Sequence, residues 1–429
     1  MTVSNGDTHT NGSATNGHAK GAFVDSTNVA ISANTPEKVP ALLEKISSFG
    51  NRFAPEDSKA RIELLDAARS LVYALETPRE AMIRFCWSQS TSYAAVETCV
   101  DLDIFAHLSK DDKPKTVAEL AETAGADSVL VARLLKHISA MGVITETAPD
   151  TYRRTGFSTS LSMERYSDAF PCLTACINDG IYALPALLKK TGYKNPSDGN
   201  NCGFQLGFRT DQHFFEFLKH NPLTAKQFNN HMSAYHQGRP SWMDVGFYDV
   251  PSLSQPLQND SDVLLVDIGG NLGHDMSEFH RKWPNAKGRL IIQDLPEVAS
   301  QARQQSLHES IDIMDHDFFK EQPVKGARAY FMHSILHDWA DENGLKILRN
   351  IVPAMKRGYS KVLINENVIP DTNAYWETTS LDIIMMADFG STERTAAHWH
   401  MLVESAGLKI AKIWTAQRGV ESLIECELA

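Results

Sequence analysis

The sequence predicts two architectures in one chain, an α-rich N-terminal region and a C-terminal α/β domain built on a largely parallel sheet. From Thr35 to about Lys110 apolar residues recur at spacings of three and four, which is typical of amphipathic helices. Beyond Pro251 short apolar runs alternate with helical stretches, as expected when helices cover a parallel sheet. The length of 429 residues allows two to three domains of about 100–200 residues each.

Composition and charge exclude several classes of protein. With 42% hydrophobic and 22% charged residues the chain has ordinary globular usage, which excludes a fibre, a wholly disordered chain and a disulfide miniprotein. Acidic side chains outnumber basic ones by 53 to 41, so the formal net charge is −12 and the chain lacks the positive surface of a polyanion binder. We therefore expect no nucleic-acid partner.

The cysteines and the N-terminus indicate a reducing compartment. The six cysteines form no CxxC pair and no regular framework, which favours reduced thiols. No apolar run reaches the roughly 18 residues that a membrane helix needs, and no signal peptide opens the sequence. We expect a cytoplasmic protein without a membrane partner.

The first two predicted segments differ in their apolar content. Residues 1–34 are rich in Asn, Thr, Gly, Ser and Ala, so they bury too little surface to offset the entropy of ordering and are predicted to be a disordered tail. Residues 35–160 are predicted to form a helical and winged-helix domain. In its winged helix, Thr116 opens a short helix that stops at Gly125, and Asp127 caps a second helix. The buried stripe of that second helix is predicted to be Leu130, Leu134, Leu135 and Ile138.

The wing and the charge of the second helix decide how this motif is interpreted. Two β-rich runs, 143–145 and 151–153, flank the turn pair Pro149-Asp150. A winged helix binds DNA through its second helix, but this helix offers only Arg133 and Lys136 as cations. A structural or dimerising role is therefore favoured.

Residues 161–250 are predicted to form a helical bridge that lines a substrate site. The segment is rich in aromatic side chains, which are usually core but can contact an apolar ligand in a bridge between domains. They include Phe214, Phe215, Phe217, Phe228 and Tyr235.

Residues 251–429 hold seven candidate strands with helices between them. The clearest helix runs from Glu342 to Lys356, and the last two strands are separated only by a short turn, which predicts a terminal antiparallel hairpin. The candidate strands are Val263–Val266, Leu290–Ile292, Ile311–Met314, Ala329–Met332, Lys361–Ile364, Leu408–Trp414 and Leu423–Cys426.

A Gly-rich turn follows the first of these strands. Gly269 and Gly270 stand where the backbone needs positive φ and a close approach to a ligand. The spacing departs from GxGxxG, and Asp267 precedes the first glycine by two residues. A carboxylate there suits a ligand amine better than a pyrophosphate, which it would repel.

Acidic residues also follow the next two strands. Asp294, with Leu295 beside it, stands where an acid in a doubly wound sheet accepts hydrogen bonds from ribose hydroxyls. Asp317 is placed to accept from an adenine amine, and the ring of Phe318 to stack on the base. With Asp267, these residues predict an adenosine-containing cofactor that has a charged amino-acid end.

As a set, these motifs resemble the S-adenosylmethionine-dependent O-methyltransferases of the plant caffeic-acid type, and most closely their fungal polyketide-modifying relatives. The resemblance rests on the motifs already described, on the run Phe331–Trp339 with its His-Asp-Trp, and on Glu393-Arg394-Thr395. It covers roughly Glu80 to the C-terminus. It implies a winged-helix dimerisation domain, a helical bridge and a Rossmann-like catalytic domain, with S-adenosyl-L-methionine as cofactor and a homodimer as the assembly.

The resemblance also implies the catalytic residues. Methyl transfer to oxygen requires that a proton leave a weakly nucleophilic hydroxyl, and histidine is the natural base at neutral pH. His337 matches the family's catalytic base, while Glu366 and Glu393 match its two supporting acids, which would orient the imidazole and stabilise its cation. The implied reaction is methylation of a phenolic or enolic hydroxyl of an aromatic or polyketide secondary metabolite.

Two positions depart from the family pattern. The family often has a lysine where His333 stands, which we predict to be a cofactor contact, and a glycine where Asn271 stands. Asparagine tolerates the left-handed backbone that the turn needs. His333 and His337 are four residues apart but make only half a metal site, so no metal is expected.

A non-methylating reaction is the alternative. Some relatives of this family keep the cofactor as an electrostatic prop and catalyse dehydration or pericyclic reactions. The presence of His337, Glu366 and Glu393 favours methylation, because a pericyclase needs no proton acceptor there, although His337 is also able to serve a dehydration.

Overall fold

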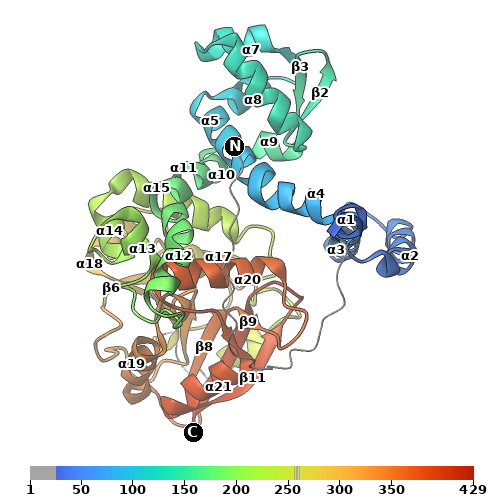
Figure 1. Cartoon of the computed structure of the whole chain (residues 1–429). Coiled ribbons are helices and arrows are strands. Elements are labelled where there is room, and N and C mark those ends of the chain that lie inside the picture. Colours follow the sequence, from blue (N-terminus) through green and yellow to red (C-terminus); the bar gives the residue numbers. More distant parts are fainter. Residues whose placement is uncertain (1–25, 256, 258, 260) are drawn as a thin grey trace, which may run out of the picture. The chain divides into compact units, whose positions relative to one another are not determined.

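The computed structural model describes residues 26–255, 257, 259 and 261–429, and the chain divides into two compact units that meet between Phe157 and Ser158 (Figure 1). The segment 161–250, predicted as a separate bridge, lies within the second unit together with the α/β residues. The physical reason is a shared core, because Phe204 and Phe214 of this segment pack with Met385 and Phe389 from the C-terminal part of the chain.

The predicted tail falls only partly within the described residues. Residues 1–25 lie outside the described residues, but Ser26–Ile31 form helix α1, so the prediction of disorder through Asn34 is wrong for this stretch. The N–H of Asn34 donates to the carbonyl oxygen of Glu76 at 2.9 Å, and the N–H of Thr35 donates to Ala74 at 3.2 Å. These partners are remote in sequence, so the composition of the segment does not reveal them.

The first unit confirms the predicted helical pattern. Asp57 caps α3 by accepting the N–H of Ala60 at 2.9 Å, and Thr77 and Glu80 form a capping box at the start of α4. The elements are η1 (Pro36–Lys38), α2 (Val39–Gly50), α3 (Ser58–Leu75), α4 (Pro78–Ile83), the π-helix η2 (Arg84–Ser88), α5 (Gln89–Asp101) and α6 (Ile104–Ser109).

The winged helix also forms as predicted (Figure 1). Helix α7 ends at Gly125 with a φ of 63°, and Asp127 caps α8 by accepting the N–H of Leu130 at 2.9 Å. The strands pair antiparallel in the order β1-β3-β2. The elements are β1 (Lys115–Thr116), α7 (Val117–Ala124), α8 (Ser128–Ala140), β2 (Ile144–Ala148) and β3 (Thr151–Arg154).

The buried stripe of α8 differs from the predicted one. The buried residues are Val131, Leu135 and Ile138, whereas Leu130 is 43% exposed. Several apolar residues on α8 satisfy a helical spacing, and the pattern alone does not say which of the overlapping stripes faces the unit's core.

The second unit begins with helices. These are α9 (Gly156–Ser160, which spans the boundary), α10 (Glu164–Ser167), α11 (Ala169–Cys176), α12 (Asn178–Lys190), α13 (Gly203–Phe208), α14 (Phe214–His220), α15 (Pro222–Tyr235) and α16 (Val250–Ser254). By length and composition alone, Glu164–Lys190 is long and apolar enough to cross a membrane. The stretch is three successive helices, and Cys172, Cys176 and Leu187 on it are buried in the unit's core.

A seven-stranded sheet follows, with the order β11-β12-β8-β7-β4-β5-β6. The pairs among β4 to β8 in this sheet are parallel, and the last two strands form the predicted antiparallel hairpin. All seven candidate strands are confirmed, as β4 (Val263–Ile268), β5 (Arg289–Asp294), β6 (Ile311–Asp315), β7 (Ala329–His333), β8 (Lys361–Glu366), β11 (Leu408–Thr415) and β12 (Ser422–Leu428).

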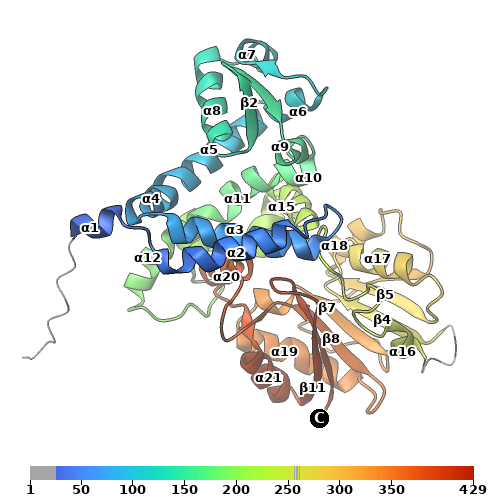
Figure 2. The same ribbon diagram turned by 90° about the vertical axis from the view of Figure 1, so that its right-hand side faces the viewer.

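Helices cover both faces of this sheet (Figure 2). Along β7, Tyr330 and Met332 pack in the core beneath α19 and α21, while Ala329 and Phe331 pack in the core beneath α16 and α17. The remaining elements are α17 (His274–Lys282), α18 (Pro296–Ala302), η3 (Leu336–Asp338), α19 (Asp341–Ile351), η4 (Val352–Ala354), β9 (Val368–Ile369), α20 (Trp376–Ile384), the π-helix η5 (Met385–Phe389), β10 (Arg394–Thr395) and α21 (Ala396–Ser405).

Helix α19 ends earlier than predicted. The α-helix stops at Ile351 and continues as the 3-10 turn η4, which contains Pro353. Proline lacks the N–H that an α-helix needs, so the α-helix ends there although apolar residues continue at helical spacing.

Candidate active site

His337 lies on a tight turn that follows β7, and Glu366 at the end of β8 holds the backbone of that turn. Glu366 Oε1 accepts the N–H of Ile335 at 2.9 Å and the N–H of Leu336 at 2.7 Å. Its Oε2 lies 3.9 Å from His337 Nδ1, beyond hydrogen-bond distance. Glu366 therefore fixes the main chain of the turn by hydrogen bonds and acts on the imidazole by its charge, without a hydrogen bond to the ring.

Arg394 and Ser391 hold the same turn from its carbonyl side. The guanidinium of Arg394 is buried and donates to the carbonyl oxygens of Leu336 and Trp339, both at 2.7 Å. The hydroxyl of Ser391 donates to the carbonyl oxygen of His337. The sequence contained Arg394 within a recognised motif, but its role depends on contacts with a turn that is remote in the chain.

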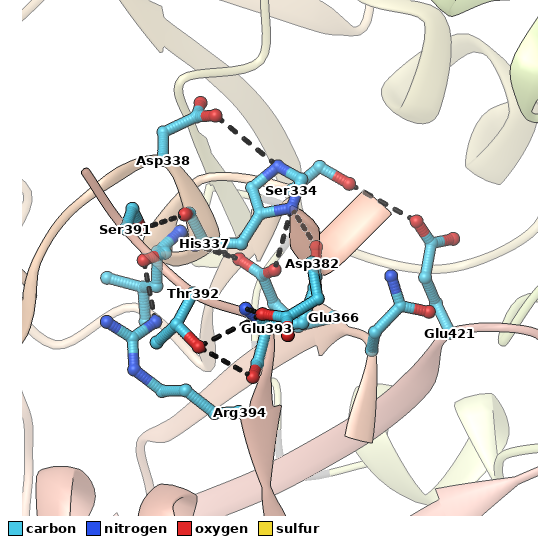
Figure 3. Close-up of polar contacts among 12 residues, drawn as sticks. Ser334, His337, Asp338, Glu366, Asp382, Ser391, Thr392, Glu393, Arg394 and Glu421 are labelled. Carbon is cyan, nitrogen blue, oxygen red and sulfur yellow. Dashed lines mark hydrogen bonds and ion pairs between the residues drawn. The ribbon is translucent and has the colours of Figure 1, made fainter. Parts of the chain in front are cut away.

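Carboxylates surround the imidazole of His337 (Figure 3). Its Nδ1–H donates to Glu393 Oε1 at 2.7 Å, and both groups are buried. Nε2 is the other ring nitrogen and lies 3.6 Å from Asp338 Oδ1. The backbone N–H of Glu393 is fixed in turn by Asp382 Oδ1, which accepts it at 2.9 Å.

The charges of this cluster favour the imidazolium form of the ring. Burial lowers the pKa of His337, but the carboxylates of Glu366, Glu393 and Asp338 outweigh it and hold that pKa well above its ordinary value. Burial also raises the pKa of Asp338, to about 7, against the opposing effect of His337. Near neutral pH, His337 and Asp338 therefore stay protonated to a greater extent than the same side chains would in isolation.

The Gly-rich turn at the end of β4 packs closely against a buried acid. Asp267 is 1% exposed, and within the described residues its Oδ2 has no hydrogen-bond partner. A Cβ at Gly270 would lie 2.5 Å from that oxygen, and a Cβ at Gly269, where φ is 76°, would lie 2.5 Å from Ile335 Cδ1. The predicted positive φ is found at Gly269 but not at Gly270, where the close approach to Asp267 is what disfavours a side chain. Asn271 takes a left-handed φ of 48° as expected.

The other predicted cofactor residues lie at the same edge of the sheet. Asp294 ends β5, where its carboxylate accepts the N–H of Asn271 at 2.9 Å and of Leu295 at 2.8 Å. Asp317 and Phe318 follow β6, the next strand. Because β4, β5 and β6 are parallel neighbours, their carboxyl ends bring these side chains to one edge.

His333, at the end of β7, lies in a second cluster of charged groups. Its Nδ1–H donates to Asp275 at 2.8 Å, and its Nε2 lies 3.3 Å from Glu421 Oε2. The imidazole of His236 packs edge-on against it, with ring centroids 4.5 Å apart. Burial lowers the pKa of His333, but Asp275 and Glu421 raise it well above the ordinary value. The sequence interpretation missed Asp275, Glu421 and His236, which carry no motif of their own.

His333 and His337 do not share a site. His333 groups with His236 and Glu421, whereas His337 groups with Glu366 and Glu393. The four-residue spacing that suggested half a metal site therefore has no structural counterpart between these two histidines.

Family models match two stretches of the chain. One, described as an O-methyltransferase domain, matches residues 210–409, and one described as an O-methyltransferase dimerisation domain matches residues 88–163. The chain is 37% identical to the O-methyltransferase mpaG of Penicillium brevicompactum, over 91% of this chain and 98% of that protein. It is 33% identical to the O-methyltransferase mfmE of Annulohypoxylon moriforme, over 94% of this chain and 99% of that protein.

Solved structures resemble the whole described architecture. LepI in complex with SAM has a TM-score of 0.83 and 30% identity, covering 92% of this chain and 99% of that chain. A structure described as a pericyclic reaction enzyme gives the same TM-score of 0.83 and 30% identity, covering 92% and 100%. OxaC in complex with sinefungin and meleagrin has a TM-score of 0.79 and 25% identity, covering 92% and 99%.

Proposed function

Because the chain belongs to the O-methyltransferase family, we propose that it methylates a phenolic or enolic hydroxyl of an aromatic or polyketide secondary metabolite, with His337 as the general base. The chain is a methyltransferase, and its cofactor is S-adenosylmethionine. The assignment of His337 as the base rests chiefly on one observation. That observation is the buried 2.7 Å hydrogen bond between His337 Nδ1 and Glu393.

This hydrogen bond fixes which ring nitrogen takes the proton. A carboxylate accepts but does not donate, so Nδ1 carries the hydrogen and Nε2 is left to accept the proton of the acceptor hydroxyl. Glu393 then stabilises the imidazolium that forms, and Glu366 and Arg394 keep the turn in place during the transfer. S-adenosylmethionine, when bound, supplies an electrophilic methyl group on a positively charged sulfur.

The proposed cofactor contacts follow from the geometry of the sheet edge. We assign the buried carboxyl oxygen of Asp267, which has no hydrogen-bond partner among the described residues, and the backbone at Gly269 and Gly270 to the aminoacyl end. Asp294 and Leu295 are proposed for the ribose side, and Asp317 and Phe318 for the adenine side. Both ring nitrogens of His333 face partners within its own cluster, so its proposed effect on the cofactor is through charge.

A non-methylating reaction is the second candidate, because solved relatives include a protein described as a pericyclic reaction enzyme. The pairing of His337 with Glu393 favours methylation, since a pericyclic step transfers no proton to a base. Dehydration is the variant of this candidate that would still use His337.

We further propose that the protein acts as a cytoplasmic homodimer. The match to a dimerisation domain supports the dimer, and in the first unit Phe85 and Trp87 are 62% and 63% exposed in the single chain. Apolar surface of this kind is typical of a subunit interface. Light scattering at working concentration tests it, and a monomeric mass would contradict the proposal.

The decisive experiment follows the methyl group. Wild type and His337→Ala are incubated with S-adenosylmethionine labelled on its methyl group and a panel of phenolic polyketides and flavonoids, and the products are followed by mass. Transfer of label by wild type and its loss in His337→Ala are expected. Unlabelled isomerised or dehydrated products, with cofactor binding verified by calorimetry, would favour the second candidate.

A further inference from the structure

The His333 cluster presents two imidazole nitrogens to one carboxylate. Glu421 Oε2 lies 3.3 Å from His333 Nε2, and Glu421 Oε1 lies 3.5 Å from His236 Nε2. The three ligand atoms lie within 4.8 Å of one another. The methyl-transfer chemistry proposed above uses none of these pairings.

The outer hydrogen bonds fix the tautomer of both rings. His236 Nδ1 lies 3.1 Å from the carbonyl oxygen of Met232, and His333 Nδ1 lies 2.8 Å from the carboxylate of Asp275. Both partners are acceptors, so each Nδ1 carries a hydrogen, and Nε2 is the ring nitrogen on each side from which a metal ion would displace any proton to take the lone pair. Within the described residues, the buried His236 Nε2 has no hydrogen-bond partner. Imidazoles that ligate metals are held by outer-sphere bonds of this kind.

From these contacts we infer that His236, His333 and Glu421 bind a divalent transition-metal ion, with zinc the best match, and that Asp275 orients His333 from outside. Two imidazoles and one carboxylate are a ligand set that zinc takes, at about 2.0–2.2 Å from each ligand atom. Ligands at that distance in a tetrahedron lie about 3.4 Å apart. Each imidazole nitrogen lies about this far from one of the two Glu421 oxygens, with His333 Nε2 3.3 Å from Oε2 and His236 Nε2 3.5 Å from Oε1.

The His337 cluster provides the contrast that makes this assignment specific. There the ring nitrogen that faces the carboxylates is Nδ1, and it lies 2.7 Å from Glu393. Two ligands of one metal ion do not approach so closely, so this contact is a hydrogen bond with a proton between the atoms. The Oε1 of Glu366 is also occupied by main-chain N–H groups.

The site would join three parts of the second unit. His236 follows α15, His333 ends β7, and Glu421 precedes β12. An ion held by all three ties the helical segment to the sheet beside the turn of His337. We therefore expect the metal to raise the melting temperature, because a ligand that binds the native state alone stabilises it.

Cobalt(II) is the probe, because it takes zinc sites and its visible absorption reports its ligands. Full-length protein treated with a chelator and dialysed is titrated with Co²⁺, and Zn²⁺ is counted by mass spectrometry of the metal. We expect one ion per chain, an intense tetrahedral absorption band and a higher melting temperature. His236→Ala and Glu421→Gln should each weaken binding at least tenfold, and Asp275→Asn about 10–100-fold as an outer-sphere change.

Two controls separate this site from other histidine and acid pairs. His400→Ala removes an exposed histidine whose Nδ1 lies 3.5 Å from Glu404, and His337→Ala removes the centre of the other cluster. Both should bind Co²⁺ as wild type does, and cooperative melting verifies that each variant is folded. The inference is overturned if wild type takes up no stoichiometric ion, if the ligand variants bind as tightly as wild type, or if His337→Ala loses the ion. Metal binding is read without turnover, so failure of the proposed methylation leaves this test intact.

Discussion

The two histidines that follow β7 sit only four residues apart, yet they face different surroundings. His337 donates from Nδ1 to Glu393 in a 2.7 Å hydrogen bond and leaves Nε2 beside Asp338 at 3.6 Å. His333 donates from Nδ1 to Asp275 and directs Nε2 at Glu421, across from the Nε2 of His236. Both rings lie among carboxylates, but only the second has a partner for each nitrogen.

This difference shows that proximity of histidine to acid does not define a role. The number of carboxylates around an imidazole sets how strongly a positive charge on the ring is favoured. Which ring nitrogen faces a carboxylate, and at what distance, decides whether a proton or a metal ion fits between them. A ring with one nitrogen tied and one available suits proton transfer. A ring with one nitrogen tied from outside and the other aimed at a second ligand suits ion binding.

The largest expected effect separates the two histidines by kinetics. His337→Ala should lower kcat by about 10²–10⁴-fold, the usual contribution of a general base, with the Kd for S-adenosylhomocysteine unchanged. His333→Ala should weaken that Kd and lower kcat by less than about tenfold, because its effect on the cofactor is through charge. Steady-state kinetics and calorimetry on both variants check this. Equal losses of kcat would remove the distinction between the two sites.

The next effect concerns the carboxylate that touches His337. The base must be unprotonated, and since the pKa of His337 is raised, the rate should climb as pH rises through a value above about 6.5. Glu393→Gln keeps a hydrogen-bond acceptor but removes one of the charges that raise this pKa. The ascending limb should therefore move to lower pH, while the maximal rate falls about 10–100-fold. A pH profile of kcat measures both, and an unmoved limb would contradict the assignment.

Cofactor binding should be separable from proton transfer. Asp294 ends β5 with its carboxylate fixed by the N–H groups of Asn271 and Leu295. Asp294→Ala should weaken the Kd for S-adenosylhomocysteine by about tenfold, which corresponds to about 1.4 kcal/mol, and leave kcat at saturating cofactor nearly unchanged. Calorimetry beside saturation kinetics tests this. Unchanged affinity would show that the ribose contact lies elsewhere.

The last prediction extends the comparison to a buried acid without a histidine. Asp388 in η5 is fully buried, and within the described residues neither carboxyl oxygen has a hydrogen-bond partner. Burial raises its pKa from 3.8 to about 8. The folded state thus holds a proton that the unfolded chain releases above pH 3.8, so the free energy of unfolding contains a contribution that is lost as pH rises toward 8.

A neutral replacement of Asp388 should flatten this dependence. Wild type should lose up to about 1.4 kcal/mol of stability per pH unit from this group across the window, and Asp388→Asn should not. Denaturant unfolding at pH 5 and pH 8 measures the difference. Asp371→Asn, at an exposed position, is the matched control and should behave as wild type. An identical slope for Asp388→Asn and wild type would refute the assignment.

Local sequence determined much of the fold. Short apolar runs between helical stretches predicted the seven strands of the sheet. Asp127, Thr116 and Gly125 marked helix boundaries by capping chemistry that acts over three or four residues. Asp267, Asp294 and Asp317 were predictable as a group because parallel strands necessarily bring their carboxyl ends to one edge. His337 and Glu393 were found through motif resemblance, and their contact follows from the structure.

Only the tertiary structure decided the remaining contacts. Glu366 was predicted to orient an imidazole, but it binds main-chain N–H groups, which have no sequence signature. Asp275, His236 and Glu421 reach His333 from three other elements, and Arg394 reaches the turn from a fourth. Capping and periodicity act between near neighbours in the chain, whereas these contacts depend on how the strands are ordered and how the helices pack. The sequence therefore specified the helices and strands and identified the reacting histidine. The packing of these elements determined which side chains surround that histidine and influence its charge.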